Sequence, residues 1–410
     1  MKAGVAITGL GVVAPLGNSV EELFASLHVG KSGIRALPAP CSVGSAPSVG
    51  ATAETPACGR IPETRLRMLD RVSYLALVAA TQAIEDSGID FSQENRERCG
   101  VSVGTGMGGA ATTDEGYHTL YAERSDRIKP FTVIAAMTNA AAAWIGLEYA
   151  LVGPNLTYST ACSSSAVSIG EAAEKIRTGR AEVMIAGGAE APLTPGVLRA
   201  WDAMRTLARP DKVNPGASCR PFSRNRSGLV LGEGAAFLVL ESWDHAVQRG
   251  AKIHAVLRGY GLTTDAAHIT RPTVIGQTSA MVAALNAAGL APDDVDYINA
   301  HGTATLQNDA VETAAIKEVF GPRAYQIPVS STKSMHGHLL GAAGALELVI
   351  CVGCLERGWI PPTMHLDQPD PACDLDYVAG AARENIRLRI ALSNSFAFGG
   401  TNAVLAVEKV

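Results

Sequence analysis

The stretch 156–179 places a cysteine where nucleophilic chemistry is possible. Residues 156–159 alternate apolar and polar side chains, which predicts a short buried strand. From Ala166 onward, apolar residues recur at three- and four-residue spacing, which predicts a helix ending at Gly179. Cys162 therefore falls at a strand-to-helix turn, where helix N–H groups and the helix dipole are expected to lower the pKa of its thiol. Most buried cysteines are inert, but the small residues around this one leave a substrate access to the sulfur.

Three later stretches also place polar, reactive residues among small ones, each directly after a predicted strand. They cover residues 299–305, 330–344 and 394–402. Open α/β sheets bind their ligands at the carboxyl ends of strands, so these stretches are candidates for one site. A lone histidine is more often structural than catalytic. However, His301 in the first stretch and His338 in the second, together with a helix-start cysteine, indicate a shared catalytic centre.

Alternating strand-like and helix-like segments must position these residues. Strands are expected at 5–11, 100–104, 181–188, 235–240, 255–261, 296–300, 326–330, 390–394 and 403–408, and helices near 19–28, 69–87 and 276–289. Such alternation predicts a mostly parallel sheet covered by helices on both faces. The pattern begins again near residues 249–252, so we expect two similar α/β units, residues 1–250 and 251–410.

The composition excludes several classes of protein. With 410 residues, 47% of them hydrophobic and 18% charged, the chain can bury a large core and is unlike a disordered chain. A formal net charge of −5 argues against general nucleic-acid binding. No apolar run is long enough for a membrane span, and the N-terminus reads as a strand rather than a signal peptide. Eight scattered cysteines predict free thiols in a reducing cytoplasm.

Two further motifs suggest other sites, but their contexts do not support them. Residues 104–109 match GxGxxG after a strand, yet no acidic residue follows at the distance that a dinucleotide site requires. Cys351 and Cys354 form a CxxC pair within an apolar helical run, and no second pair exists. The sequence therefore predicts core packing there, with no metal site and no bound nucleotide.

The reactive stretches together resemble the β-ketoacyl-ACP synthase (condensing enzyme) family, in particular its synthase II and type II polyketide ketosynthase branch. The resemblance extends over nearly the whole chain and keeps the order of the family's motifs. It implies a thiolase-like fold, in which two similar αβα halves form a five-layer αβαβα core, and usually a dimer. The motifs are Thr160-Ala-Cys-Ser-Ser, His301-Gly-Thr-Ala-Thr, Lys333-Ser-Met-His-Gly-His-Leu-Leu-Gly-Ala-Ala-Gly and Asn394-Ser-Phe-Ala-Phe-Gly-Gly-Thr-Asn.

The resemblance implies a decarboxylating Claisen condensation with a Cys-His-His site. Cys162 would take an acyl chain from acyl carrier protein and hold it as a thioester. His301 and His338 would then stabilise the enolate formed as malonyl-ACP loses CO2. The backbone N–H groups of Cys162 and Phe398 would form the oxyanion hole while 3-oxoacyl-ACP is produced. No permanently bound cofactor is implied, because the substrates are carried on the phosphopantetheine of the carrier protein.

Supporting roles also follow from the resemblance. Lys333 would orient His338 and pair with Glu347, while Thr303 and Thr305 would bind pantetheine. Met107, inside the GxGxxG loop, would line the acyl pocket and help to set chain length. Because the carrier protein is acidic, exposed arginines are expected to bind it. The candidates are Arg65, Arg67, Arg71, Arg205 and Arg209.

Three departures from the family leave the pathway open. Ala397 stands where a glycine usually precedes the gating phenylalanine, so its Cβ restricts the loop. His336 stands where fatty-acid synthases have threonine, and residues 306–309 resemble polyketide or aryl-polyene synthases. The product could therefore belong to fatty-acid, polyketide or polyene synthesis. The partner subunit could be identical, or it could be a chain-length-factor-like subunit without which this chain is inactive.

Rival activities fit less well. A degradative thiolase would need a second catalytic cysteine near the C-terminus, whereas the last cysteine, Cys373, lies outside any glycine-rich site. A cysteine hydrolase would need one histidine oriented by Asp or Asn, which two histidine motifs match poorly. A chain-length factor itself would lack the nucleophile.

Overall fold

The computed structural model describes residues 4–38, 48–56 and 61–410. Ten strands of this part form one sheet in the order β10-β9-β11-β12-β8-β1-β7-β6-β4-β5, and β2 pairs with β3 in a small second sheet. The strands are β1 (Val5–Val13), β2 (Ile34–Ala36), β3 (Val49–Ala51), β4 (Cys99–Gly104), β5 (Asn155–Tyr158), β6 (Val183–Glu190), β7 (Gly234–Ser242), β8 (Ala255–Thr264), β9 (Tyr297–Asn299), β10 (Val329–Ser330), β11 (Ile390–Phe396) and β12 (Thr401–Lys409).

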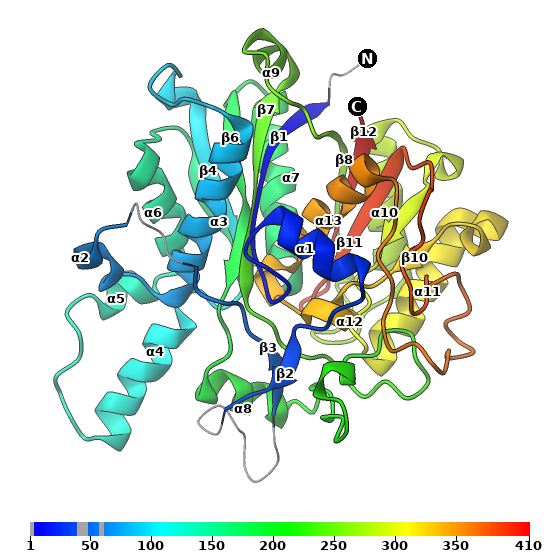
Figure 1. Ribbon diagram of the computed structural model, residues 1–410, viewed down its shortest axis with the longest axis horizontal. Helices are drawn as coiled ribbons and strands as arrows, with labels where there is room; N and C mark the ends of the chain where they lie inside the picture. The colour runs from blue at the N-terminus through cyan, green and yellow to red at the C-terminus, as the bar shows by residue number, and fades with distance from the viewer. Residues whose placement is uncertain (1–3, 39–47, 57–60) are drawn as a thin grey trace.

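The helices cover both faces of the large sheet (Figure 1). They are α1 (Val20–His28), α2 (Glu63–Leu66), α3 (Arg71–Ser87), α4 (Ala110–Tyr117), α5 (Thr132–Ala136), α6 (Ala140–Tyr149), α7 (Ser164–Arg177), α8 (Pro195–Ala203), α9 (Trp243–Gln248), α10 (Val274–Ala288), α11 (Leu306–Phe320), α12 (Lys333–His336) and α13 (Ala343–Arg357).

The strand order occurs twice, which confirms the prediction of two similar α/β units. The order β5-β4-β6-β7-β1 in the first half is matched by β10-β9-β11-β12-β8 in the second, with the same strand directions. The halves are joined where β1 pairs antiparallel with β8, Val5 lying opposite Leu257. The division of the chain at residue 250 stays a prediction.

The alternation of segments predicted a mostly parallel sheet, and this prediction is wrong, because the sheet is mixed. Strands β9, β10 and β11 are parallel, but β12 runs antiparallel to β11 because only the turn 397–400 connects them. Residue periodicity is identical in both kinds of strand and so carries no information on direction. The predicted burial of β5 is also wrong. It is an edge strand, and the Leu156 side chain is 42% exposed.

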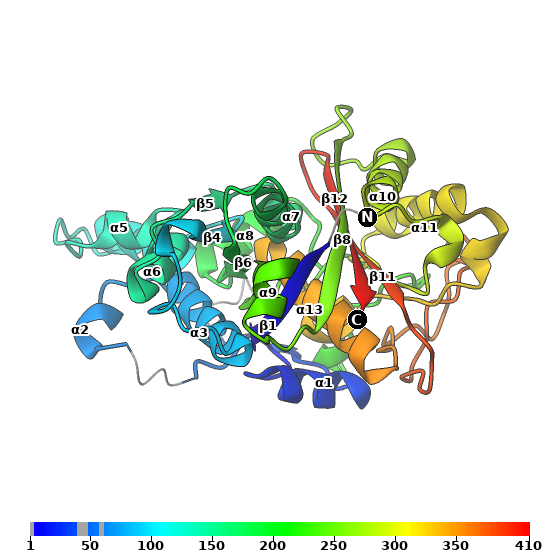
Figure 2. The same cartoon turned by 90° about the horizontal axis from the view of Figure 1, so that it is seen from above.

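Helices α7 and α13 lie between the two halves and give the fold its central layer. Figure 2 shows them between the sheet portions, with α3 on the outer side of the first half and α10 and α11 on that of the second. Helix α13 is buried from Ala343 to Leu355, so both CxxC cysteines are core residues, as predicted. The six cysteines of the described residues are free, whereas Cys41 and Cys58 lie outside that part.

A buried histidine connects the two halves. His254 precedes β8, and its ring contacts the carboxylates of Asp86 on α3 (2.8 Å) and Glu356 on α13 (2.7 Å). Burial alone would lower the pKa of His254, but the hydrogen bonds and charges of the two carboxylates outweigh it and raise the pKa to about 9. Protonated His254 therefore stabilises the contact between α3 and α13.

The stability that His254 provides should depend on pH. Because its folded pKa of about 9 exceeds its unfolded value, the contribution is complete below about pH 6.5 and is lost as the pH rises through 9. We expect His254→Gln to lower the free energy of unfolding by about 2 kcal/mol near pH 6. Urea titrations at about pH 6 and pH 10 measure this, and the gap between wild type and variant should narrow at the higher pH. An equal gap at both pH values would contradict the assignment.

Candidate active site

Cys162 lies at the turn that the sequence predicts, on the short helix η4 (Ala161–Ser163) between β5 and α7. Its side chain is buried, and neighbouring hydroxyls hold the turn. Ser164 Oγ accepts a hydrogen bond from Thr160 N (2.9 Å) and donates to Ala161 O (2.6 Å). Ala161 has a φ of +52°, a conformation that persists only where the surroundings enforce it. The serines around Cys162 therefore fix the position of its sulfur.

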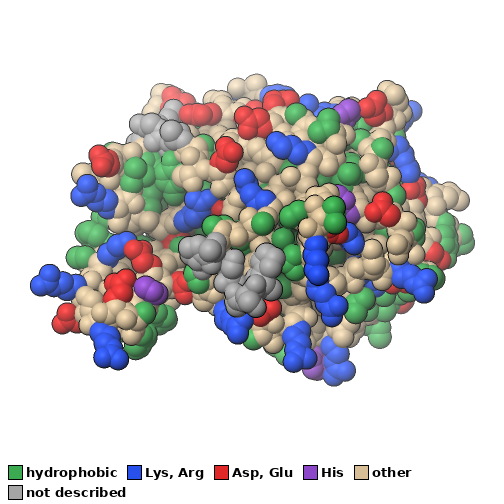
Figure 3. All heavy atoms as spheres, turned by 60° about the horizontal axis from the view of Figure 1, so that its bottom comes forward, with side chains coloured by type: hydrophobic (Ala, Val, Ile, Leu, Met, Phe, Trp, Pro, Cys, Tyr) green, Lys and Arg blue, Asp and Glu red, His purple; other side chains and the backbone are tan. Residues whose placement is uncertain are grey.

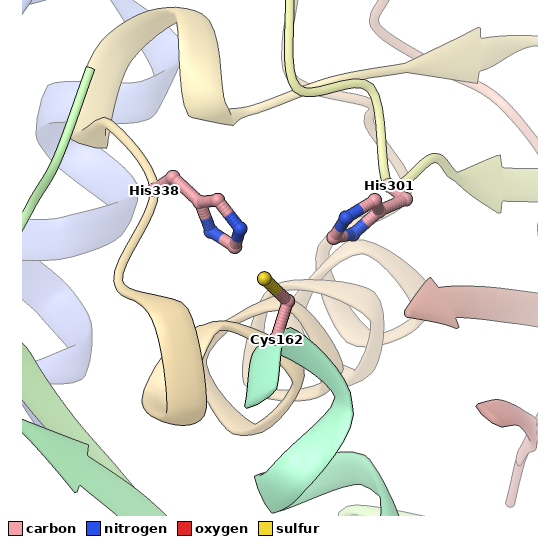
Figure 4. A group of neighbouring side chains, drawn as sticks. All are labelled: Cys162, His301 and His338. Carbon is pink, nitrogen blue, oxygen red and sulfur yellow. The ribbon is translucent and has the colours of Figure 1, made fainter. Parts of the chain in front are cut away.

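His301 and His338 reach the sulfur from the second half of the chain (Figure 4). His301 follows β9, and its backbone N–H donates to Glu312 Oε1 at 2.8 Å. His338 follows α12, and its backbone N–H donates to Val230 O at 2.7 Å. The two rings stand edge-to-face with their centroids 5.3 Å apart. One ring nitrogen of each histidine and the sulfur of Cys162 all lie within 4.8 Å of one another.

Both histidines are neutral. Burial, reinforced by the positive charge of Lys333, lowers the pKa of His301 and of His338 well below the usual value. Among the described residues, neither ring nitrogen of His338 has a hydrogen-bond partner, nor does Nδ1 of His301. Unpaired nitrogens on buried rings cost free energy, so their presence indicates donors reserved for a substrate.

The prediction of a lowered thiol pKa is wrong for the free protein. Burial raises the pKa of Cys162 to about 12, although the charge of Lys333 and the backbone N–H groups of Phe398 and Cys162 itself oppose the rise. The helix start is as predicted, but loss of hydration outweighs its effect on the sulfur. A base must therefore accept the thiol proton, and the adjacent neutral imidazoles can do so.

Lys333 and Glu347 form an ion pair behind the histidines, and both side chains are completely buried. Lys333 opens α12 and Glu347 lies on α13, so the pair joins two elements of the second half. Glu312 on α11 lies nearby and accepts hydrogen bonds from the backbone N–H groups of His301 and Gly302, both at 2.8 Å. These buried charges fix the backbone on which the two imidazoles depend.

A cavity of about 340 Å³ opens onto the three reactive side chains. Phe398, Thr303 and Thr305 also line it, and the two threonine hydroxyls lie 3.0 Å apart. The Phe398 ring stacks on Trp201 at a centroid distance of 5.9 Å. Met107 is not among the lining residues, so its predicted place in an acyl pocket stays a prediction.

His336 is a structural residue. Its Nδ1 lies 2.7 Å from Gly337 O and its Nε2 lies 2.9 Å from Thr332 Oγ1, so both ring nitrogens have partners. Burial lowers the pKa of His336 to about 3. The ring is therefore a neutral donor to one neighbour and acceptor from the other, with no nitrogen left for a substrate.

The arginines predicted to bind carrier protein differ in their surroundings. Arg205 lines the cavity and is exposed, and Arg209 is exposed four residues later. Helix α8, which ends just before Arg205, lies at the bottom of Figure 1, and Figure 3 shows several Lys and Arg side chains on the face that this view brings forward. Positive side chains at the entrance suit an acidic partner.

The other three arginines are not among the residues that line this cavity. Arg65 and Arg67 form solvent-exposed ion pairs with glutamates. Arg71 is engaged with Glu233, which accepts two hydrogen bonds from its guanidinium at 2.7 and 2.8 Å. Of the five candidates, Arg205 and Arg209 are therefore the best placed to meet a substrate carrier.

Sequence reasoning missed Glu312 and Trp201. Glu312 had a signal, because the polar residues Asn308, Asp309, Glu312 and Thr313 recur on one face of α11 and all are buried. When a helix follows a histidine motif, polar residues that recur on one of its faces indicate side chains that hydrogen-bond to the backbone of the site. Trp201 had no such signal, because its contact with Phe398 joins residues distant in the sequence.

Two family models match the chain. The model described as "Beta-ketoacyl synthase, N-terminal domain" covers residues 2–246, and "Beta-ketoacyl synthase, C-terminal domain" covers residues 254–367. Nodulation protein E of Rhizobium meliloti (strain 1021) is 46% identical over 410 residues, covering 100% of both chains. The 3-oxoacyl-[acyl-carrier-protein] synthase 2 of Coxiella burnetii is 42% identical over 413 residues, covering 100% of this chain and 99% of its own.

Solved structures agree with the fold. A type II polyketide acyl carrier protein in complex with its hexaketide-bound ketosynthase includes a chain with a TM-score of 0.91 and 34% identity, covering 100% of this chain and 99% of its own. The ishigamide ketosynthase/chain length factor gives a TM-score of 0.91 and 32% identity, with 100% of both chains covered. The chain belongs to the β-ketoacyl synthase family of condensing acyltransferases, as its motifs predict.

Within the described residues, no helix is long and apolar enough to cross a membrane.

The raised thiol pKa predicts how Cys162 reacts in the absence of substrate. Iodoacetamide should alkylate Cys162 at a rate that rises about tenfold per pH unit between about pH 7 and pH 10, because only the thiolate reacts. Intact-mass analysis follows the adduct, and Cys162→Ala identifies the labelled site. A rate that levels off below about pH 9 would mean that the thiol pKa is not raised.

Proposed function

We propose that this chain elongates acyl chains by decarboxylating condensation, with Cys162 as nucleophile and His301 and His338 as enolate-stabilising donors. The observation that carries the proposal is the convergence of one thiol and two neutral, unpartnered imidazoles on a single cavity. A hydrolase would use one oriented histidine to activate water, whereas two neutral donors suit an enolate oxygen.

Acylation exchanges one thioester for another. Cys162 Sγ attacks the carbonyl carbon of acyl-ACP, and a neighbouring neutral imidazole accepts the thiol proton. The tetrahedral oxyanion accepts hydrogen bonds from the N–H groups of Cys162 and Phe398, the same groups that oppose the rise in the pKa of the thiol. Collapse breaks the carbon–sulfur bond to the carrier, and the proton returns to the departing pantetheine thiolate.

Condensation follows on the acylated enzyme. Malonyl-ACP places its thioester oxygen between the N–H groups of His301 and His338, and cleavage of its carboxylate releases CO2 and leaves an enolate. The enolate carbon attacks the acyl carbonyl on Cys162, a new carbon–carbon bond forms, and the carbon–sulfur bond breaks. The sulfur departs as a thiolate, which takes up a proton from solvent and restores the thiol. Burial, reinforced by the charge of Lys333, keeps both imidazoles neutral, so that each enters the reaction with one N–H available. The product is 3-oxoacyl-ACP.

Thr303 and Thr305 are placed to bind the pantetheine arm, since their hydroxyls line the same cavity. Arg205, which lines this cavity, and Arg209, whose backbone N–H donates to the lining residue Ser227, would bind the acidic carrier protein. We propose that the chain works in the cytoplasm, which is consistent with six free, buried cysteines among the described residues. Similarity to both fatty-acid and polyketide synthases leaves the pathway open.

We also propose that a second subunit covers the lobe formed by η3 (His118–Ala122), α4, α5 and α6, together with the edge strand β5. This lobe projects from the body of the molecule (Figure 1). It carries a group of exposed large apolar side chains, a composition typical of interfaces. They are Tyr117, Tyr121, Phe131, Val133, Ile134, Met137, Leu147, Val152 and Leu156. The partner could be a second copy or a subunit like a chain-length factor.

Acyl transfer to Cys162 tests the reaction directly. Incubation with a panel of acyl-ACPs should add one acyl mass to the wild type and none to Cys162→Ala, and malonyl-ACP should then remove it as 3-oxoacyl-ACP forms. His338→Ala should still be acylated but should lose about 100-fold or more in malonyl-ACP decarboxylation, because one enolate donor is missing. Absence of any adduct with the chain alone would favour the reading that a partner subunit is required.

Charge introduced into the exposed apolar lobe should prevent pairing. Val133 is 72% exposed on α5, so Val133→Asp should leave the fold intact and give a species of about 42.5 kDa in light scattering, the mass of one chain. Val213→Asp, at a residue 95% exposed outside this lobe, is the matched control and should assemble like the wild type. An assembled Val133→Asp protein would place the interface elsewhere.

A further inference from the structure

Glu190 is a completely buried carboxylate that the reaction described above does not use. It is the last residue of β6, at the carboxyl end of this strand, and Cys162 lies near the same end of the sheet. Buried carboxylates elsewhere in the described chain often face a cation, as Glu241 faces Arg249 at 2.6 Å. Glu190 forms no ion pair with the described residues, and its partners are N–H and O–H groups. The role of these hydrogen-bond donors, rather than of a cation, must therefore explain why a carboxylate is buried at this position.

Two segments from opposite halves of the chain donate to this carboxylate. From the loop after β4, Gly106 N lies 2.6 Å from Oε2, and Met107 N and Thr105 Oγ1 lie 3.0 and 3.2 Å from Oε1. From the segment after His338, Gly341 N lies 2.9 Å from Oε2. Burial raises the pKa of Glu190 to about 7, although these donors oppose the rise. Above that pH the hydrogen bonds go to a charged acceptor and are the stronger kind, so Glu190 ties the two segments together.

The two segments approach each other so closely that position 341 has no room for a side chain. A Cβ on Gly341 would lie 2.4 Å from Gly106 N and 2.6 Å from the carboxylate of Glu190, so only glycine fits. The preceding residue, Leu340, has a φ of +44° and packs in the same apolar cluster as Cys162. A leucine in this conformation must be held by its surroundings, and the hydrogen bond from Gly341 to Glu190 provides the nearest restraint.

We propose that Glu190 is a positioning residue that holds Met107 and Leu340 around Cys162, and so sets both the acyl-chain preference and the placement of His338. This inference rests on the proposed function and on the expectation from the sequence that Met107 lines the acyl pocket. The carboxylate acts through the two backbone segments and touches no substrate. A Cβ on Gly106 would lie 3.0 Å from Glu190 Oε2 and 3.8 Å from Ala161 O, so the carboxylate lies close to the residue that precedes Cys162.

The test compares Glu190→Gln with the matched control Glu241→Gln, which also removes a buried carboxylate but at the opposite end of the β6–β7 pairing. A glutamine offers one acceptor oxygen, and its NH2 group opposes the backbone donors. We expect Glu190→Gln to change the ratio of Cys162 acylation rates from long-chain and short-chain acyl-ACP by about tenfold, because small displacements near a reacting group are costly. Decarboxylation of malonyl-ACP should fall by about the same factor.

Two further readouts separate positioning from general destabilisation. Loss of the negative charge should lower the pH at which iodoacetamide labels Cys162, an effect that Glu241→Gln should not produce. Should Glu190→Gln not fold, Thr105→Val removes one of the four donors and should shift the acylation ratio in the same direction by a smaller factor. A variant at Glu190 with the wild-type ratio and wild-type decarboxylation would overturn the inference. A wild type that forms no 3-oxoacyl-ACP would instead overturn the proposed function.

Discussion

The buried ion pair between Lys333 and Glu347 is the interaction on which the chemistry of this protein depends. Both side chains are fully removed from water, and removing one member of such a pair costs about 3–5 kcal/mol because the other charge is left uncompensated. The positive charge lowers the pKa of both catalytic histidines and opposes the rise in the pKa of Cys162. Burial is the main cause that keeps the imidazoles neutral, and the charge of Lys333 reinforces it while making the thiol more acidic than burial alone would.

The central helices α7 and α13 explain how such a charge can be accommodated. They lie between the two halves and bury small and apolar side chains against both sheet portions, so the core around the ion pair is closed to water. Cys162 stands at the beginning of α7, and Glu347 lies within α13. The same packing that provides the dry core thus sets the distance between the nucleophile and the charges that control it.

Backbone geometry, rather than side-chain reach, brings the reactive groups together. Ala161 and Leu340 both hold positive φ values beside Cys162, and hydrogen bonds from their neighbours keep them there. Strain of this kind accumulates at functional sites because the surrounding structure compensates for it. The orphaned nitrogens of His338 belong to the same pattern, since they are left without partners until a substrate oxygen arrives.

The sequence by itself determined the family and the repeated α/β units, and it picked out the three residues that meet at the cavity, because motifs and periodicity are local properties of the chain. It also determined the turn that carries Cys162, since small residues and a helix start are visible in a short window. Only the tertiary structure decided the direction of β12, the exposure of β5 and the protonation of Cys162. Connection geometry, sheet order and desolvation depend on residues distant in the chain, and desolvation at the sulfur outweighed the local effect of the helix start.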